Sequence, residues 1–199
     1  MPELTIGLLS RLAACFALGS IPFAVISMWG TGVDITKFGS GNPGFNNVLR
    51  YSKWRAAFCL AGDAGKGFAA VWLCWQPGDA ALLGWLFGIV AVLGHSFSPW
   101  LGFQGGKGIA TVAGAMLRMY PALLLPCAGL YVLLRLIGGK LQWTERGFIA
   151  SFSAVVLFAL LIAWREGFPT AWACVAVVVF IAWRHKKNIQ VLAGAATQS

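Results

Sequence analysis

The chain has 199 residues, of which 59% are hydrophobic and only 11% charged, and its formal net charge is +9 at pH 7. Soluble domains average about half apolar and a quarter charged residues, so this composition excludes an ordinary soluble protein and predicts an integral membrane protein. The length suits one compact bundle, which predicts a single transmembrane domain over residues 1–199. Basic cytoplasmic loops near anionic lipid headgroups explain the positive charge better than nucleic acid does, so no nucleic-acid partner is expected.

Apolar stretches follow one another along the chain with short polar interruptions. They cover residues 4–29, 55–76, 80–100, 109–137, 147–164 and 168–183. A helix needs about 20 residues to cross a membrane, so the stretch 109–137 is too long for one span. Arg118 and Pro121 interrupt it, and we divide it there. The predicted fold is therefore all-α, an integral membrane bundle of seven short transmembrane helices.

The first stretch contains the run Gly19-Ser20-Ile21-Pro22, which predicts a kink or a close approach by a neighbouring helix. The stretch is long and lacks a clear small-residue cleavage site, so we expect a retained helix rather than a signal peptide. The five cysteines lie inside apolar stretches without C-x-x-C spacing. They indicate small buried side chains rather than disulfides or a metal site.

The distribution of Lys and Arg predicts the orientation. With seven spans and the N-terminus outside, the loops 30–55, 101–107 and 138–146 and the C-terminal tail 184–199 face the cytoplasm. These segments hold ten of the fifteen Lys and Arg residues, namely Lys37, Arg50, Lys53, Arg55, Lys107, Lys140, Arg146, Arg184, Lys186 and Lys187. Six spans would move the last five outside, against the tendency of Lys and Arg to remain inside.

Two glycine-rich loops carry polar chemistry on this predicted cytoplasmic face. The first reads Gly-Ser-Gly-Asn-Pro-Gly over residues 39–44, and Arg50 follows it. The second reads Gly-Gly-Lys-Gly over residues 105–108 and runs into an apolar helix pattern. Glycines let the backbone present N–H groups to an anion, and a helix N-terminus beside Lys107 favours phosphate. Arg50 can hold a phosphate bidentately, whereas Lys107 is a point charge.

Neither loop is a Walker A motif, because Lys107 is followed by Gly108 and the spacing from Gly102 to Gly106 is one residue short. The residues alone leave two interpretations open. One is an enzyme acting on a phosphorylated substrate at the membrane surface. The other is a membrane transporter or binding protein for a small phosphorylated solute. A transporter is expected to have internal repeats and polar sites at the membrane midplane, and no repeat is visible here.

Four motifs together resemble a known family. They are Asp34-Ile35 with Gly39-Ser40-Gly41-Asn42-x-Gly44, Asn47 and Arg50; Asp63-x-x-Lys66-Gly67; Gly94-His95 through Phe103 to Gly105-Gly106-Lys107-Gly108 and Ala110-Thr111; and Arg184-His185 with Asn188-Ile189 and Gly194. The chain resembles the bacterial acyl-phosphate:glycerol-3-phosphate acyltransferases, the PlsY family. The similarity covers nearly the whole chain, and the first and third motifs are long and specific.

The resemblance implies an active site at the cytoplasmic face of the bacterial inner membrane. It implies transfer of a fatty acyl group from acyl phosphate to the sn-1 hydroxyl of glycerol 3-phosphate, giving lysophosphatidic acid for phospholipid synthesis. The family's functional positions fall on Ser40, Arg50, Lys107, His185 and Asn188. Phosphate contacts are expected from Gly39, Gly41, Asn42, Gly44, Asn47, Gly105, Gly106 and Gly108. No metal or cofactor is expected, and the enzyme that forms acyl phosphate is a candidate partner.

Several positions depart from the family pattern. Phe45 and Asn46 replace its usual Ala-Thr, Gln104 replaces a basic residue, Val191 replaces an arginine, and Ile149 stands where the family has a serine, which makes Ser151 a candidate.

Four ionisable residues need an interpretation of their own. Asp63 and Lys66 are three positions apart on one helix face, which favours a structural ion pair over a catalytic role. His95 is expected to have a structural hydrogen-bonding role. His185 either acts as a general base or binds substrate while a substrate phosphate oxygen takes the proton. Binding is favoured, because Asp34 is the only cytoplasmic carboxylate that can be named as a support for the imidazole.

Overall fold

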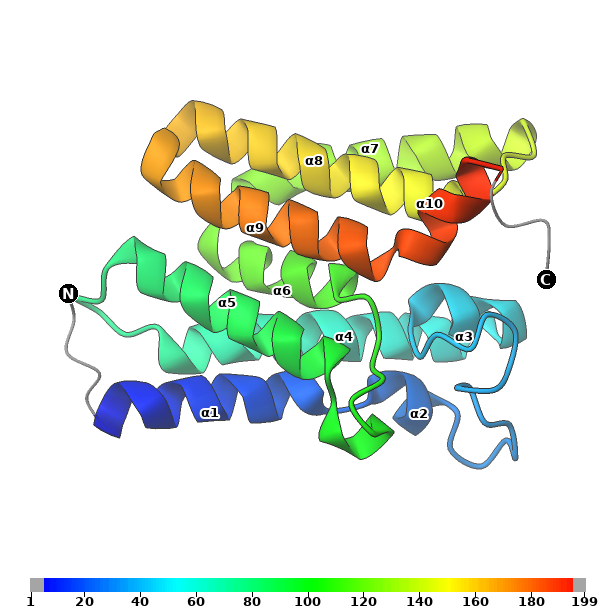
Figure 1. Ribbon diagram of the computed structural model, residues 1–199, viewed down its shortest axis with the longest axis horizontal. Helices are drawn as coiled ribbons and strands as arrows, with labels where there is room; N and C mark the ends of the chain where they lie inside the picture. Colours follow the sequence, from blue (N-terminus) through cyan, green and yellow to red (C-terminus); the bar gives the residue numbers. More distant parts are fainter. Residues whose placement is uncertain (1–5, 195–199) are drawn as a thin grey trace. The chain divides into compact units, whose positions relative to one another are not determined.

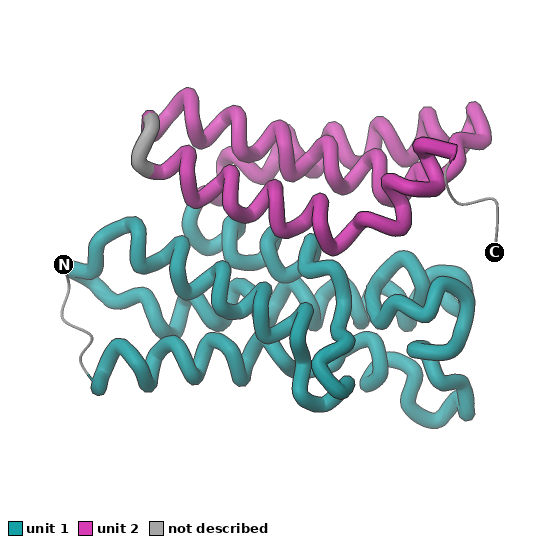
Figure 2. The backbone as a smooth tube through the Cα atoms, viewed as in Figure 1, with its two compact units in different colours: residues 1–119 teal, residues 120–199 magenta. Residues whose placement is uncertain are grey.

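The computed structural model describes residues 6–194, apart from the side chains of residues 168 and 169. Helices and loops make up this part of the chain, and no strand occurs in it, as the sequence predicted. The chain divides into two compact units, residues 1–119 and residues 120–199 (Figure 2). The expectation of a single domain over the whole chain remains a prediction.

Unit 1 contains both glycine-rich loops. Its elements are α1 (Ile6–Ser20), α2 (Phe23–Ser27), α3 (Phe45–Tyr51), α4 (Lys53–Cys74), α5 (Ala81–Ser96), the 3-10 helix η1 (Pro99–Leu101) and α6 (Ile109–Met119) (Figure 1). Helix α4 packs on α6, and α1 packs on α5. Small residues allow these helices to approach closely, since a side chain at Gly114 of α6 would overlap the Ala64 carbonyl of α4.

The first apolar stretch is broken where Ile21 and Pro22 interrupt the helix. Helix α1 ends at Ser20, and α2 begins after Pro22, which confirms the predicted kink as a break. Side chains of α4 and of the segment that follows α5 donate to the carbonyls that the break exposes. Ser98 Oγ donates to Ser20 O at 2.6 Å, and Lys66 Nζ donates to Ile21 O at 2.7 Å. The break is therefore tied to the α4 and α5 side of unit 1.

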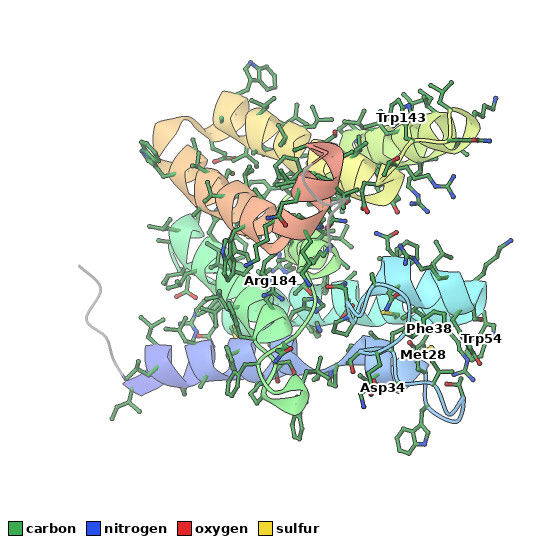
Figure 3. All side chains as sticks on the ribbon, turned by 45° about the vertical axis from the view of Figure 1, so that its right-hand side comes forward. Met28, Asp34, Phe38, Trp54, Trp143 and Arg184 are labelled. Atoms are coloured by element: carbon green, nitrogen blue, oxygen red, sulfur yellow. The ribbon has the colours of Figure 1, made fainter. Side chains whose placement is uncertain are left out.

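A small apolar cluster supports the first glycine-rich loop. It consists of Ala24, Met28, Ile35, Val48, Ala56 and Cys59, with Phe38 partly buried against it. Figure 3 shows Met28 and Phe38 side by side at this end of unit 1, with Asp34 close to them. The loop that carries residues 39–44 thus rests on a hydrophobic base formed by α2, α3 and α4.

Unit 2 consists of α7 (Pro121–Lys140), α8 (Arg146–Glu166), α9 (Phe168–Arg184) and the short α10 (Lys186–Leu192). Helix α8 packs against both α7 and α9, and the turn between α7 and α8 lies at the same end of this unit as α10 (Figure 1). Helix α6 ends at Met119 and α7 begins at Pro121. The division of the long apolar stretch at Arg118 and Pro121 is therefore confirmed.

Five helical segments are long and apolar enough to cross a membrane. They are Ile6–Ser27, Lys53–Cys74, Ala81–Leu101, Pro121–Lys140 and Arg146–Glu166, and Ile109–Met119 and Thr170–Arg184 are shorter apolar helices. These segments follow the predicted stretches in order. The count of seven spans and the orientation of the two termini remain predictions.

Candidate functional site

One amide side chain braces the first glycine-rich loop. Asn47 Oδ1 accepts a hydrogen bond from the Ser40 N–H at 3.1 Å. Its amide group donates to the carbonyls of Ile35 at 3.0 Å and Phe38 at 2.8 Å. Because Asn47 is only 1% exposed and all three bonds go to backbone, the side chain closes the loop onto α3 from below. Asn47 was expected to contact phosphate, and the structure places it as a support for the loop.

Arg50 lies beside the turn at the start of the same loop. Gly39 has a φ of +54°, and a Cβ there would stand 2.5 Å from Asn47 Oδ1 and 3.5 Å from Arg50 Nη1. Glycine suits this position because it adopts positive φ without strain and leaves room for both side chains. Ser40 and Arg50 are both exposed. The loop therefore presents the Ser40 hydroxyl at its surface, with the Arg50 guanidinium of α3 beside its first turn.

The second glycine-rich loop is seated on the end of α5. The Gly105 N–H donates to the Ser96 carbonyl at 3.1 Å, and a side chain at Gly105 would overlap the His95 carbonyl oxygen. Gly106 packs on the edge of the His95 ring, since a Cβ there would overlap Nε2. His95 and Ser96 thus hold both glycines from beneath.

Lys107 lies between this seat and the first turn of α6. The helix begins at Ile109, and the Gly108 carbonyl accepts a hydrogen bond from Val112 N–H at 2.8 Å. Lys107 is half-buried. A lysine directly before a helix N-terminus combines a full positive charge with the partial positive charge of the helix dipole, which favours an anion.

The two glycine-rich loops meet in unit 1. A Cβ at Gly106 would stand 2.9 Å from the Pro43 carbonyl oxygen. Arg50 lies on α3, which directly follows one of the two meeting loops, and Lys107 lies on the other loop. A small pocket lies beside the contact, and its lining includes Pro22, Pro43, Lys66, His95, Ser98 and Gly106. The sequence predicted that both loops share a face, but it gave no sign of this backbone contact.

A buried ionic cluster lies beneath the second loop. Lys66 Nζ is 2.7 Å from Asp63 Oδ1, and His95 Nδ1 is 3.3 Å from the same oxygen. The expected ion pair between Asp63 and Lys66 is therefore confirmed. The sequence did not predict that His95 joins it, because nothing in the spacing from α4 to α5 reveals that contact.

His185 and Asn188 belong to unit 2. His185 Nδ1 is 2.8 Å from the Ile181 carbonyl oxygen, and the ring stacks on Phe148 with centroids 4.9 Å apart. A carbonyl accepts only, so in the neutral ring Nδ1 carries the proton and Nε2 is the acceptor nitrogen. From the sequence, a carboxylate was expected to be needed to orient this imidazole, whereas the backbone carbonyl of Ile181 in the preceding helix turn orients it.

Asn188 also has a partner that the sequence did not reveal. Its amide group donates to Glu145 Oε2 at 2.5 Å, which joins α10 to the turn before α8. Ser151, the candidate for the missing serine, donates to the Gly147 carbonyl at 2.8 Å within α8. The Ser151 hydroxyl is therefore used in a hydrogen bond within its own helix.

Asp34 lies at the edge of the first loop and is occupied locally. The backbone N–H and the hydroxyl of Thr36 both donate to Asp34 Oδ1, at 3.0 Å and 2.6 Å, and Lys37 Nζ lies 3.6 Å from Oδ2. The bonds from Thr36, helped by the charge of Lys37, lower the pKa of Asp34 below its usual value. A carboxylate stabilised in its charged form is a poor proton acceptor, so Asp34 serves the turn.

Comparison with known proteins assigns the family. A sequence model described as Glycerol-3-phosphate acyltransferase matches residues 9–195. A protein named glycerol-3-phosphate acyltransferase from Burkholderia thailandensis is 37% identical over 192 residues, which cover 94% of this chain and 93% of the relative. A protein of the same name from Bordetella petrii is 37% identical over 191 residues, which cover 92% of this chain and 89% of the relative. The chain belongs to the glycerol-3-phosphate acyltransferase family.

Solved structures agree with this assignment. The crystal structure of PlsY, an integral membrane glycerol 3-phosphate acyltransferase, in its glycerol 3-phosphate form matches with a TM-score of 0.80 and 28% identity, over 96% of this chain and 95% of that chain. Its lysophosphatidic acid form matches with a TM-score of 0.78 and 29% identity, over 94% and 93% of the two chains. The resemblance to the PlsY family is confirmed, and the chain is a multi-pass membrane acyltransferase of phospholipid synthesis.

Proposed function

We propose that the protein transfers a fatty acyl group from acyl phosphate to the sn-1 hydroxyl of glycerol 3-phosphate, giving lysophosphatidic acid and inorganic phosphate. The observation that carries the proposal is the meeting of the loops 39–44 and 105–108 in a chain of this family. Glycerol 3-phosphate and lysophosphatidic acid name two forms of the similar PlsY structure, which supports this acceptor and product.

The chemistry of the two loops supports acyl phosphate as the donor. Acyl phosphate and glycerol 3-phosphate are both anions, so a site that brings them together must offset their repulsion. Arg50 on α3, beside the first loop, and Lys107 on the second loop supply two cations, and the glycine-rich backbone and the start of α6 supply N–H groups. Neither loop contains a carboxylate. This environment suits two phosphate groups at once.

The reaction requires little covalent chemistry from the protein. The glycerol hydroxyl oxygen attacks the acyl carbon, the new ester bond forms, and the bond from that carbon to the phosphate oxygen breaks. The leaving phosphate is already a good leaving group. The chain therefore contributes by holding the substrates in line and by stabilising the negative charge that develops, through Lys107, Arg50 and loop N–H groups.

The proton of the glycerol hydroxyl needs an acceptor. His185 supports this role because the Ile181 carbonyl holds the proton at Nδ1 and leaves Nε2 as the acceptor nitrogen. This orientation supplies the support that the sequence alone did not show. We therefore assign the proton to His185 Nε2, and we assign Asn188 to substrate binding.

The orientation in the membrane follows the cation distribution. We place the protein in the bacterial inner membrane with seven spans, the N-terminus outside and the C-terminus in the cytoplasm. Within unit 1 the loops 39–44 and 105–108 lie at one end. Within unit 2 the turn before α8 contacts α10 through Glu145 and Asn188. In each unit, the segments predicted to face the cytoplasm therefore lie close to one another, which supports this orientation.

The proposal is tested with purified protein in detergent or nanodiscs. Glycerol 3-phosphate is supplied with either palmitoyl phosphate or palmitoyl coenzyme A, and lysophosphatidic acid is measured by mass spectrometry. We expect product with palmitoyl phosphate and none with the coenzyme A ester. Product from the coenzyme A ester alone would refute the donor assignment. Uptake of glycerol 3-phosphate into proteoliposomes without product would favour the transporter interpretation.

A further inference from the structure

Asp63, Lys66 and His95 form a buried polar cluster that the proposed reaction does not use. Their exposed fractions are 2%, 4% and 7%. Burying a charged pair costs solvation energy, and a hydrophobic replacement of similar size is often at least as stable. A cluster of this kind in a small bundle therefore calls for a role besides stability.

The cluster forms a continuous chain of contacts through unit 1. Lys66 Nζ donates to Ile21 O at 2.7 Å, at the break between α1 and α2, and it is equally close to Asp63 Oδ1. Asp63 Oδ1 in turn lies 3.3 Å from His95 Nδ1 near the end of α5. Three segments of unit 1 are thereby held at one carboxylate.

The edge of the His95 ring that faces away from Asp63 reaches the second glycine-rich loop. A Cβ at Gly106 would overlap Nε2 of the imidazole, so the backbone of Gly106 rests directly against the ring. The His95 carbonyl meets Gly105 in the same way. Any rotation of this ring would displace Gly106, and Lys107 is the next residue.

We infer that Asp63 and His95 are positioning residues for Lys107. Asp63, held by Lys66, fixes the orientation of the His95 ring, and the ring fixes Gly106 against Pro43, so that Lys107 and the start of α6 are aimed at the substrate phosphate. This inference rests on the proposed function, because it takes Lys107 to be a phosphate ligand. Neither Asp63 nor His95 is assigned any contact with substrate.

Two substitutions of His95 separate its two contacts. In His95→Asn the side-chain amide can still reach Asp63 from near the Nδ1 position, but the edge that supports Gly106 is lost. In His95→Gln the longer side chain can reach Gly106, but its amide no longer lies at the Nδ1 position. We expect both variants to raise the KM for glycerol 3-phosphate or to lower kcat, with kcat/KM reduced about 10- to 100-fold, as a small misplacement of a binding group does.

A matched control is available at another ion pair of the same unit. Arg11 on α1 pairs with Asp79 in the loop between α4 and α5, and Arg11 Nε also donates to the Cys74 carbonyl at 2.7 Å. Asp79 precedes the start of α5, whereas the second glycine-rich loop is bonded to Ser96 at the end of α5, so this ion pair lies away from the loop. Asp79→Asn should change the thermal stability of the protein in detergent and leave kcat/KM within about twofold of the parent value, because the positioning chain remains intact.

The deciding experiment is a double-mutant cycle between His95 and Lys107. kcat/KM for glycerol 3-phosphate is measured for the parent, His95→Asn, Lys107→Ala and the double variant. Binding of inorganic phosphate is measured by titration calorimetry on the same four proteins. If His95 acts through Lys107, His95→Asn should cost at least about tenfold in the parent and less than about twofold once Lys107 is absent.

Equal losses in both backgrounds would overturn the inference, since a merely structural His95 would weaken either protein alike. Unchanged kcat/KM in a folded His95→Asn variant would also overturn it. Should that variant fail to fold, His95→Gln takes its place in the same cycle. Failure of the proposed function gives a different result, namely a parent protein that forms no lysophosphatidic acid.

Discussion

Gly106 and Pro43 lie in backbone contact although they come from loops far apart in the sequence. A Cβ at residue 106 would stand 2.9 Å from the Pro43 carbonyl oxygen and would overlap His95 Nε2. This contact joins the loop that precedes α3 and its Arg50 to the loop that carries Lys107. The site in unit 1 therefore depends on the absence of a side chain at residue 106 as much as on its two cations.

Gly106→Ala is expected to separate the two loops. The added methyl group meets the Pro43 carbonyl and the His95 ring, and neither can move freely because both are buried. We expect kcat/KM to fall about 10- to 100-fold, because a small displacement of Lys107 disturbs substrate alignment. Gly65→Ala is the matched control, since a Cβ at Gly65 meets nothing within 4 Å. Normal activity of folded Gly106→Ala would contradict the contact.

Removal of either cation should impair catalysis without unfolding the protein. We expect Arg50→Ala and Lys107→Ala each to lower kcat by about 100-fold or more. The loss of a preorganised charge contact of this kind costs about 2.7–4 kcal/mol of transition-state stabilisation. Lys107→Arg should also fail, because a planar guanidinium does not replace a point charge within a tight loop. The rates are measured on protein that elutes as the parent does in size-exclusion chromatography. Near-normal turnover of Lys107→Ala would remove the argument for a phosphate site.

The sequence predicted the helical fold and its main interruptions. Hydrophobic stretches and Pro121 located the long helices, and Gly19 to Pro22 located the break in the first one, because apolar periodicity and proline act locally. Both glycine-rich loops were also found, since glycine runs beside a cation are local signals. The helices, the break in the first one and the glycine-rich loops all depend on residues that are neighbours in the chain, and so they could be predicted from the sequence.

The parts that the sequence missed depend on contacts between distant segments. Asn47 was expected to contact a substrate phosphate. In the structure its amide group donates to the carbonyls of residues 35 and 38 and braces the loop. His95 was expected to make some structural hydrogen bond, but its link from Asp63 to Gly106 requires the packing of α4 on α5. The Ile181 carbonyl that orients His185 is only four residues away, but a backbone carbonyl gives no signal in the pattern of side chains.

His185→Gln tests the assignment of the proton acceptor. Glutamine keeps a hydrogen-bonding group but is not a base at neutral pH, so we expect a loss of about 10²- to 10⁴-fold in kcat with little change in KM. The acidic limb of the pH–rate profile that an imidazole contributes should disappear as well. A variant that retains most of its kcat and shifts only KM would show that a substrate phosphate oxygen takes the proton and that His185 only binds.

Site-directed cysteine labelling tests the predicted membrane orientation. On a background without the five native cysteines, cysteine is placed at residue 140 or 187, both predicted to face the cytoplasm, and at residue 165, predicted to face outside. An impermeant maleimide added to intact cells should label residue 165 alone, because positively charged loops remain inside. Labelling of residue 140 or 187 from outside would exclude the seven-span topology.

The most direct test of the central claim is the stoichiometry of the reaction. Purified protein is given palmitoyl phosphate and glycerol 3-phosphate, and inorganic phosphate and lysophosphatidic acid are measured in the same samples. The account predicts that both products appear at equal initial rates and that Lys107→Ala lowers both rates by about 100-fold or more. Phosphate release without lysophosphatidic acid, or lysophosphatidic acid formation that is unaffected by Lys107→Ala, would contradict it.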